Sequence, residues 1–257
     1  MKNILLVQTG GTISCRENNG ELSATTTVTD IVSDRYQREH PGQTQFTVIK
    51  PYTILSENLQ PERWKQLAEA INKAVPEQYD GVIVTHGTDS IDFTKSFLKL
   101  HYGPGICTIG AFYPPTDPRS DAFVNFEQAV TLCTPINSRP FDYKLRKGLV
   151  ITAYPGLDYS LYAIEKALPD FVIHIMYHSG TGCTQGENRC NLIEFIKKAS
   201  DLNIPVYAIG FPEDSNIYAG HKLLKEAGMK FVPDLSFPEV LVKLSLGLEL
   251  PFVKSIC

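Results

Sequence analysis

Two short segments of the sequence concentrate side chains that can carry out acyl transfer. Residues 9–13 (TGGTI) place the hydroxyl of Thr12 directly after two glycines, which let the backbone turn sharply and approach a ligand. Residues 85–90 (THGTDS) combine a histidine, hydroxyls and the carboxylate of Asp89. A threonine hydroxyl is a weak nucleophile until a base or oriented neighbours activate it, and the second segment contains groups of that kind.

Each segment also has a plainer interpretation. A glycine pair after a strand can form a tight turn or cradle a phosphate, and Asp89 or Ser90 can simply cap a helix. A cap needs only one such residue, however, and six polar or small residues stand in a row here. The sequence contains neither GxGxxG nor GK[ST], which counts against a nucleotide-binding oxidoreductase.

A third segment, residues 56–58 (SEN), adds the hydroxyl of Ser56 and the carboxylate of Glu57. A small zwitterion needs a carboxylate for its ammonium group, and hydroxyls or backbone amides for its own carboxylate. The three segments together can supply both. They therefore favour a site for a small amino acid.

The segments follow predicted strands of a β-α alternation, which indicates a mostly parallel sheet covered on both faces. Ligands bind beyond the carboxyl ends of such strands, where the three segments lie. Apolar runs predict strands at residues 4–7, 46–49, 81–84, 106–109, 149–152, 171–176, 206–209 and 231–232. Helical spacing predicts helices at residues 61–75, 91–100, 123–132, 159–168, 192–202, 217–227 and 238–248.

Composition narrows the class of protein. The chain has 257 residues, 43% of them hydrophobic, and a formal net charge of -4. This argues against a disordered chain and against a nucleic-acid binder, which normally carries a basic face. The apolar run at residues 4–7 is too short for a signal peptide or a membrane span, and the six cysteines are scattered. We therefore expect a cytoplasmic protein without disulfides and without a membrane partner.

The motifs resemble those of the bacterial-type L-asparaginase/glutaminase family. Residues 9–13 and 85–90 are similar to its two signature segments, and residues 110–129 (GAFYPPTDPRSDAFVNFEQA) to a third segment. Ser56 and Glu57 stand where the family has its substrate clamp. The resemblance implies an asparaginase-like α/β fold, with a larger N-terminal domain of parallel or mixed sheet and a smaller, flavodoxin-like C-terminal βα domain. The expected boundaries are 1–133 and 148–257, with residues 134–147 as a linker.

The resemblance also implies an amidohydrolase that acts on the side-chain amide of a small amino acid, asparagine, glutamine or a derivative. No metal or organic cofactor is implied, and we expect a homodimer or homotetramer. The family's roles, carried over, are a nucleophile that forms an acyl-enzyme (Thr12), groups that position or activate water (Thr88 and Asp89, the latter also touching the substrate ammonium), ligands of the α-carboxylate and α-amino groups (Ser56 and Glu57), and backbone contacts (Gly11, Gly87 and Ala111).

Two departures from the family stand out. The helix at residues 123–132 runs straight into the linker, so the family's catalytic lysine has no match here. His178, placed at the carboxyl end of a strand on which His174, Met176 and His178 alternate, is the first candidate to replace it, and Lys144 the second. The lid loop, residues 14–29, has Leu22 near the position of the family's tyrosine.

The missing lysine keeps other functions open. A non-catalytic or divergent homologue that binds an amino acid, or a subunit of an assembly, would also retain Ser56, Glu57 and Asp89. Retention of Thr12 and Thr88 favours an enzyme. An amidotransferase subunit acting on charged tRNA ranks lower, because that type carries an extra N-terminal domain and this sequence begins at the first strand.

Overall fold

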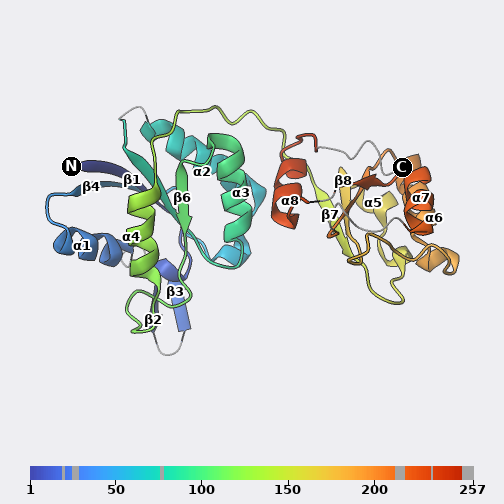
Figure 1. The fold of residues 1–257 in the computed structure, drawn as a ribbon, viewed down its shortest axis with the longest axis horizontal. Helices are drawn as coiled ribbons and strands as arrows, with labels where there is room; N and C mark the ends of the chain where they lie inside the picture. Colours follow the sequence, from blue (N-terminus) through green and yellow to red (C-terminus); the bar gives the residue numbers. More distant parts are fainter. Residues whose placement is uncertain (19–20, 25–28, 76–77, 212–217, 233, 251–257) are drawn as a thin grey trace. The chain divides into compact units, whose positions relative to one another are not determined.

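The chain forms two compact α/β units, Met1–Asp142 and Tyr143–Cys257, in the computed structural model (Figure 1). The structure describes residues 1–18, 21–24, 29–75, 78–211, 218–232 and 234–250. The division between the units falls inside residues 134–147, the segment expected to link two domains. Among the described residues, every helix is too short or too polar to cross a membrane.

The first unit is built on a parallel sheet in the order β4-β1-β5-β6. β1 lies between the two strands that follow it in this sheet, so the chain changes winding direction there, and residues Ile4, Leu5, Leu6 and Val7 are completely buried. A strand buried on both faces must be apolar throughout, as this run is. The bounds are Lys2–Gln8 for β1, Thr44–Ile49 for β4, Gly81–Thr85 for β5 and Ile106–Ile109 for β6.

Helices cover both faces of this sheet. α1 (Thr29–Glu39) and α4 (Ala122–Leu132) share one hydrophobic cluster, in which Tyr36 and Phe126 pack against the sheet. α2 (Pro61–Ala74) and α3 (Ile91–Tyr102) lie on the other side in Figure 1. The rings of Trp64 and Phe97 join these two helices, with their centroids 5.7 Å apart.

The segment after β1 differs from the prediction. Residues 14–29, expected to be a loop, contain an antiparallel hairpin of β2 (Cys15–Asn18) and β3 (Glu21–Ala24). α1 was not predicted at all, because its sequence, TDIVSDRYQRE, is largely polar. Tertiary contacts stabilise the helix although its hydrophobic pattern is weak. The centroid of the Tyr36 ring lies 6.0 Å from that of Phe46 and 5.9 Å from that of Phe126.

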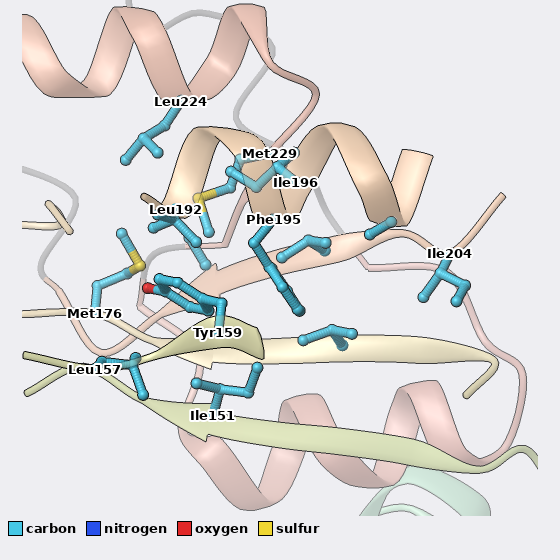
Figure 2. Packing of buried hydrophobic residues seen from close by; sticks show 14 of the residues in the cluster. Ile151, Leu157, Tyr159, Met176, Leu192, Phe195, Ile196, Ile204, Leu224 and Met229 are labelled. Carbon is cyan, nitrogen blue, oxygen red and sulfur yellow. The ribbon is translucent and has the colours of Figure 1, made fainter. Parts of the chain in front are cut away.

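The second unit has its own parallel sheet, in the order β10-β9-β8-β7. Figure 2 shows one of its hydrophobic clusters, in which Phe195 and Ile196 of α6 and Leu224 of α7 pack over the strands. A second cluster joins α8 to the sheet through residues such as Val240 and Leu244. The bounds are Gly148–Thr152 for β7, Phe171–Ile175 for β8, Val206–Ile209 for β9, Lys230–Phe231 for β10, Leu192–Asp201 for α6, Ala219–Glu226 for α7 and Phe237–Ser245 for α8.

The helix predicted at residues 159–168 is wrong. The structure has a 3-10 turn, η4 (Tyr159–Leu161), and a one-turn helix, α5 (Ile164–Ala167). Asp158 fixes the turn by accepting hydrogen bonds from both the backbone and the hydroxyl of Ser160, at 2.9 and 2.6 Å. Leu168 then takes a left-handed conformation (φ 42°), so α5 cannot continue.

The predicted linker is anchored to both units, although it has no regular secondary structure. The Arg139 backbone N–H donates to Asn72 Oδ1 at 3.0 Å, and its guanidinium donates to the His101 carbonyl at 3.0 Å. The Arg146 backbone N–H donates to the Ser245 carbonyl, in the second unit, at 2.8 Å. Residues up to Asp142 therefore belong structurally to the first unit.

A buried histidine makes the stability of the second unit dependent on pH. Burial lowers the pKa of His174 to about 4, and the side chain has no exposed surface. Below about pH 6.5 the unfolded chain binds a proton that the native state refuses, so the free energy of unfolding falls as pH drops towards 4. We expect the loss to be about 3 kcal/mol and to be absent above pH 7. Urea unfolding of wild type and His174→Gln at pH 7 and pH 4.5 measures it; equal losses in both proteins would contradict the assignment.

Candidate active site

The loops after β1 and β5 meet at the carboxyl edge of the first sheet. Gln8 pairs with Thr85 as the last step of the ladder between these strands. The backbone N–H and the hydroxyl of Thr9 then both donate to the Thr85 carbonyl, at 3.2 and 2.7 Å. Because the winding direction of the sheet changes at β1, this is the position where open parallel sheets form ligand sites. The structure thus places residues 9–13 and 85–90 side by side.

Gly11 and Gly87 are in direct backbone contact. A Cβ atom added to Gly11 would lie 2.2 Å from the Gly87 nitrogen, which no side chain can tolerate. Gly11 also has a φ of 78° and a ψ of 177°, a conformation that is essentially confined to glycine. The second glycine of TGGTI is therefore required by the close approach of the two loops.

Ser56 brings the third segment to the same place. A Cβ atom on Gly87 would lie 2.4 Å from Ser56 Oγ, so the serine side chain packs directly on the turn. Ser56 Oγ donates to Asp89 Oδ2 at 3.3 Å, and Ser90 Oγ donates to the Ser56 carbonyl at 2.6 Å. Ser90 occupies the N-cap position of α3 without a side-chain capping bond. Its hydroxyl ties two loops together, a role that the sequence, which suggests only a cap, does not reveal.

The two candidate reactive hydroxyls are both half-buried. Thr12 begins η1 (Thr12–Ser14), a single 3-10 turn. The Thr88 methyl group lies 3.3 Å from the position that a Cβ on Gly110 would take, which puts Thr88 next to the loop after β6. Ala111, the following residue, is 1% exposed. Partial exposure leaves both threonines open to a ligand from solvent.

The charge of Glu57 acts on the loop after β1. It lies exposed in η2 (Ser56–Asn58), next to the buried Ser56. The pKa of the Cys15 thiol is raised, mainly by burial and further by the negative charge of Glu57. The Cys15 thiol donates to the Gly11 carbonyl at 3.2 Å, so the group on which the charge of Glu57 acts is a neighbour of Gly11. Two carboxylates, Glu57 and Asp89, therefore belong to the loops that meet at this sheet edge, and their charge suits an ammonium group.

His178 and Lys144 lie outside the unit that holds this cluster. Both belong to the second unit and both are exposed. β8 ends at Ile175, three residues before His178. The expected alternation of His174 and His178 along one strand is therefore wrong. Their part in proton transfer stays a prediction.

Sequence reasoning missed a buried polar group beneath the site. His86 is 1% exposed and its Nε2 lies 2.9 Å from Thr94 Oγ1, which in turn accepts a hydrogen bond from Trp64 Nε1 at 3.3 Å. The one available signal was Thr94 itself. It is a completely buried polar residue on the apolar face of α3.

A candidate metal group lies elsewhere in the first unit. Within the described part of the chain, Glu39, His40 and Glu127 bring three potential ligand atoms within 4.8 Å of one another. Glu39 is already paired with Arg35 at 2.8 Å, and His40 with Glu127 at 3.2 Å. These contacts account for the clustering of the three side chains without a metal.

Comparison with known proteins agrees with this geometry. The family model "Asparaginase, N-terminal" matches residues 3–140, more than half of the chain. The chain belongs to the asparaginase family. All three loops of the candidate site lie within the matched range.

Curated relatives and solved structures extend the comparison. A subunit of the glutamyl-tRNA(Gln) amidotransferase of Saccharolobus islandicus is 32% identical over 134 residues, 50% of this chain and 29% of that protein. The corresponding subunit of Methanococcus vannielii is 32% identical over 141 residues, 52% of this chain and 32% of its own length. The matched part of the chain thus spans less than a third of the length of these relatives.

The fold likeness covers both units. The thermostable L-asparaginase of Thermococcus kodakarensis superposes with a TM-score of 0.78 at 21% identity, covering 95% of this chain and 92% of that one. L-asparaginase I of Vibrio cholerae gives 0.75 at 19% identity, with the same coverage. The expected asparaginase-like α/β fold, with a larger N-terminal and a smaller C-terminal domain, is confirmed.

Proposed function

We propose that this protein is an amidohydrolase that removes the side-chain amide of a small amino acid. The observation that carries the proposal is the convergence of three loops at one sheet edge, where Ser56 Oγ bonds Asp89 Oδ2 beside the contact of Gly11 with Gly87. Hydroxyls, carboxylates and backbone N–H groups meet there. That set matches a substrate with one ammonium group, one carboxylate and one amide.

In the proposed reaction, Thr12 Oγ attacks the carbon of the substrate amide. The hydroxyl proton passes to the leaving nitrogen and the C–N bond breaks. Ammonia departs, and the acyl group remains bound to Thr12 as an ester. Water positioned by Thr88 and Asp89 then adds to the ester, one water proton passes to Thr12 Oγ, and the C–O bond to Thr12 breaks to release the acid and restore the hydroxyl. Both steps pass through an oxyanion, which backbone N–H groups stabilise.

Binding is divided among the flanking groups. Asp89 and Glu57 neutralise the α-ammonium group of the substrate, while the Ser56 hydroxyl donates to its α-carboxylate. Ser56 must then exchange its bond to Asp89 for one to the substrate. The separation of 3.3 Å between Ser56 Oγ and Asp89 Oδ2 is long for an O–H···O bond, which favours the exchange.

Ammonia release tests the proposal. We expect the purified protein to release ammonia from asparagine, glutamine or a side-chain derivative of either, with 1:1 formation of the matching acid. A panel of these amides, with the free acids and simple primary amides as controls, identifies the substrate. The absence of release from every amide, by a protein that is folded and binds none of the amino acids, would overturn it.

The comparisons also favour a second candidate. The curated relatives are named as a subunit of glutamyl-tRNA(Gln) amidotransferase, and each matches about half of this chain. The chain would then supply ammonia to a partner. Binding of glutamine in calorimetry, with no ammonia release by the chain alone, would favour this candidate over an independent hydrolase.

We further propose that the chain assembles with copies of itself, as a homodimer or homotetramer, because closed symmetric assemblies are the commonest oligomers. Light scattering at micromolar concentration measures the mass. A monomer with full activity would contradict the assembly.

A further inference from the structure

A chain of three hydrogen bonds runs beneath the turn that carries Thr88. Trp64 Nε1 lies 3.3 Å from Thr94 Oγ1, Thr94 Oγ1 lies 2.9 Å from His86 Nε2, and His86 Nδ1 lies 2.9 Å from the Gly87 carbonyl oxygen. The residues come from α2, α3 and the loop after β5. Trp64, Thr94 and His86 are 3%, 0% and 1% exposed. This network is thus sealed from solvent.

The direction of each bond follows from what its atoms can donate. A carbonyl oxygen only accepts, so His86 Nδ1 must carry the proton that bonds Gly87. Burial, the largest effect, and the positive charge of Lys95 lower the pKa of His86 against the opposing effect of the hydrogen bond to Gly87, so above pH 7 the ring is neutral and Nε2 has no proton. Nε2 therefore accepts from the Thr94 hydroxyl. Trp64 can only donate, and it donates to the same hydroxyl oxygen.

The network fixes a peptide group of the site. Holding the Gly87 carbonyl against the His86 ring sets the plane of the peptide bond between Gly87 and Thr88. In a planar trans peptide the N–H points opposite to the carbonyl, so the Thr88 N–H is directed away from the buried ring. Gly11 and Ser56 press on Gly87 from the other loops. The turn is thereby held from three sides.

We infer that His86 is a positioning residue, which acts through Gly87 to hold Thr88 and its backbone N–H in the orientation that turnover requires. The expected effect on kcat rests on the proposed function. The expected position and tautomer of His86 rest on the hydrogen bonds alone. His86 itself exchanges no proton with a substrate, because both of its nitrogens are occupied in a closed network.

Kinetics of matched variants test the consequence. His86→Asn keeps an amide N–H near the position of Nδ1, whereas His86→Leu keeps the volume without a donor. We expect His86→Leu to lower kcat by about 100-fold, with a much smaller change in KM, since small displacements of reacting groups cost this much. His86→Asn should recover most of the loss. Thr94→Val, which frees Nε2, should fall between them.

A control separates positioning from general stability. His101 is also 1% exposed, on the same helix as Thr94, and its Nε2 lies 3.0 Å from the Arg139 carbonyl. We expect His101→Leu to lower the unfolding temperature without a comparable loss of kcat. Equal kcat losses in His86→Leu and His101→Leu, or no recovery in His86→Asn, would overturn the positioning role.

Nitrogen-15 NMR of the imidazole rings tests the structural half without any activity. Wild-type His86 should show a neutral ring protonated on Nδ1 above pH 7. Thr94→Val should keep this tautomer, because the Gly87 carbonyl still accepts from Nδ1, and should shift the Nε2 resonance, which has lost its donor. A ring protonated on Nε2 would overturn the inference even if the protein is an active amidohydrolase. The expected tautomer in a protein that releases no ammonia would leave the network intact and reject the proposed function alone.

Discussion

Thr12→Ala is expected to abolish turnover while leaving the protein folded and able to bind its substrate. In the proposed reaction this hydroxyl forms the acyl-enzyme, so alanine leaves the first step without its nucleophile. Loss of a nucleophile costs roughly four to six orders of magnitude in kcat. Because Thr12 is half-buried in a short 3-10 turn, truncation to alanine removes few contacts. Ammonia release at saturating substrate, with substrate affinity from calorimetry, measures both halves of the expectation.

Thr12→Ser is the matched control, because it keeps the hydroxyl and removes only a methyl group. We expect it to retain measurable turnover, and to form an ester that hydroxylamine or mass spectrometry can detect in wild type and Thr12→Ser but not in Thr12→Ala. Near-normal turnover by Thr12→Ala would remove this residue from the nucleophile role, with Thr88 the next hydroxyl to test.

The strands and the location of the site were predictable because both depend on local pattern. Buried parallel strands such as residues 4–7 must be apolar throughout, and the residues directly after them fall at one edge of the sheet. From that rule alone, the sequence predicts that Thr12, Ser56 and Asp89 lie near one another. The contact of Gly11 with Gly87 shows how closely the two loops approach, because no side chain fits between them.

Tertiary contacts decided what the pattern could not. α1 forms on a polar sequence because Tyr36 packs against aromatic rings from β4 and α4. The residues 159–168 look amphipathic, but the bonds of Ser160 to Asp158 and the left-handed Leu168 break the helix. In both cases, the determining partner is a particular side chain, which periodicity does not specify.

Polar networks are harder still to predict. His86 belongs to a motif whose other residues are candidate reactive groups. Only the positions of Thr94 and Trp64 in the structure reveal that the His86 ring is held in a buried hydrogen-bond network. Ser90 poses the same problem in reverse, since a serine at a helix start suggests a cap. Its hydroxyl instead bonds the Ser56 carbonyl at 2.6 Å.

Gly11→Ala is expected to destroy the site through the backbone alone. The new methyl group would lie 2.2 Å from the Gly87 nitrogen and 2.3 Å from its Cα, so the two loops must separate. The φ of 78° with a ψ of 177° adds strain that alanine cannot relieve. We expect a loss of more than about 3 kcal/mol in the free energy of unfolding, and no detectable turnover in the fraction that remains folded.

Gly42→Ala distinguishes loop separation from simple backbone strain. Gly42 has a similar φ, 71°, but a Cβ atom there meets nothing within 4 Å. Its replacement should cost about 1 kcal/mol and leave kcat unchanged, because only the left-handed conformation is penalised. Urea unfolding and ammonia release on both variants give the comparison. If Gly11→Ala behaved like Gly42→Ala in both measurements, the close approach of the two loops would not be what builds the site. If only Gly11→Ala loses turnover, the contact between Gly11 and Gly87 is the element that keeps the loop of Thr12 beside the loop of Thr88 and Asp89.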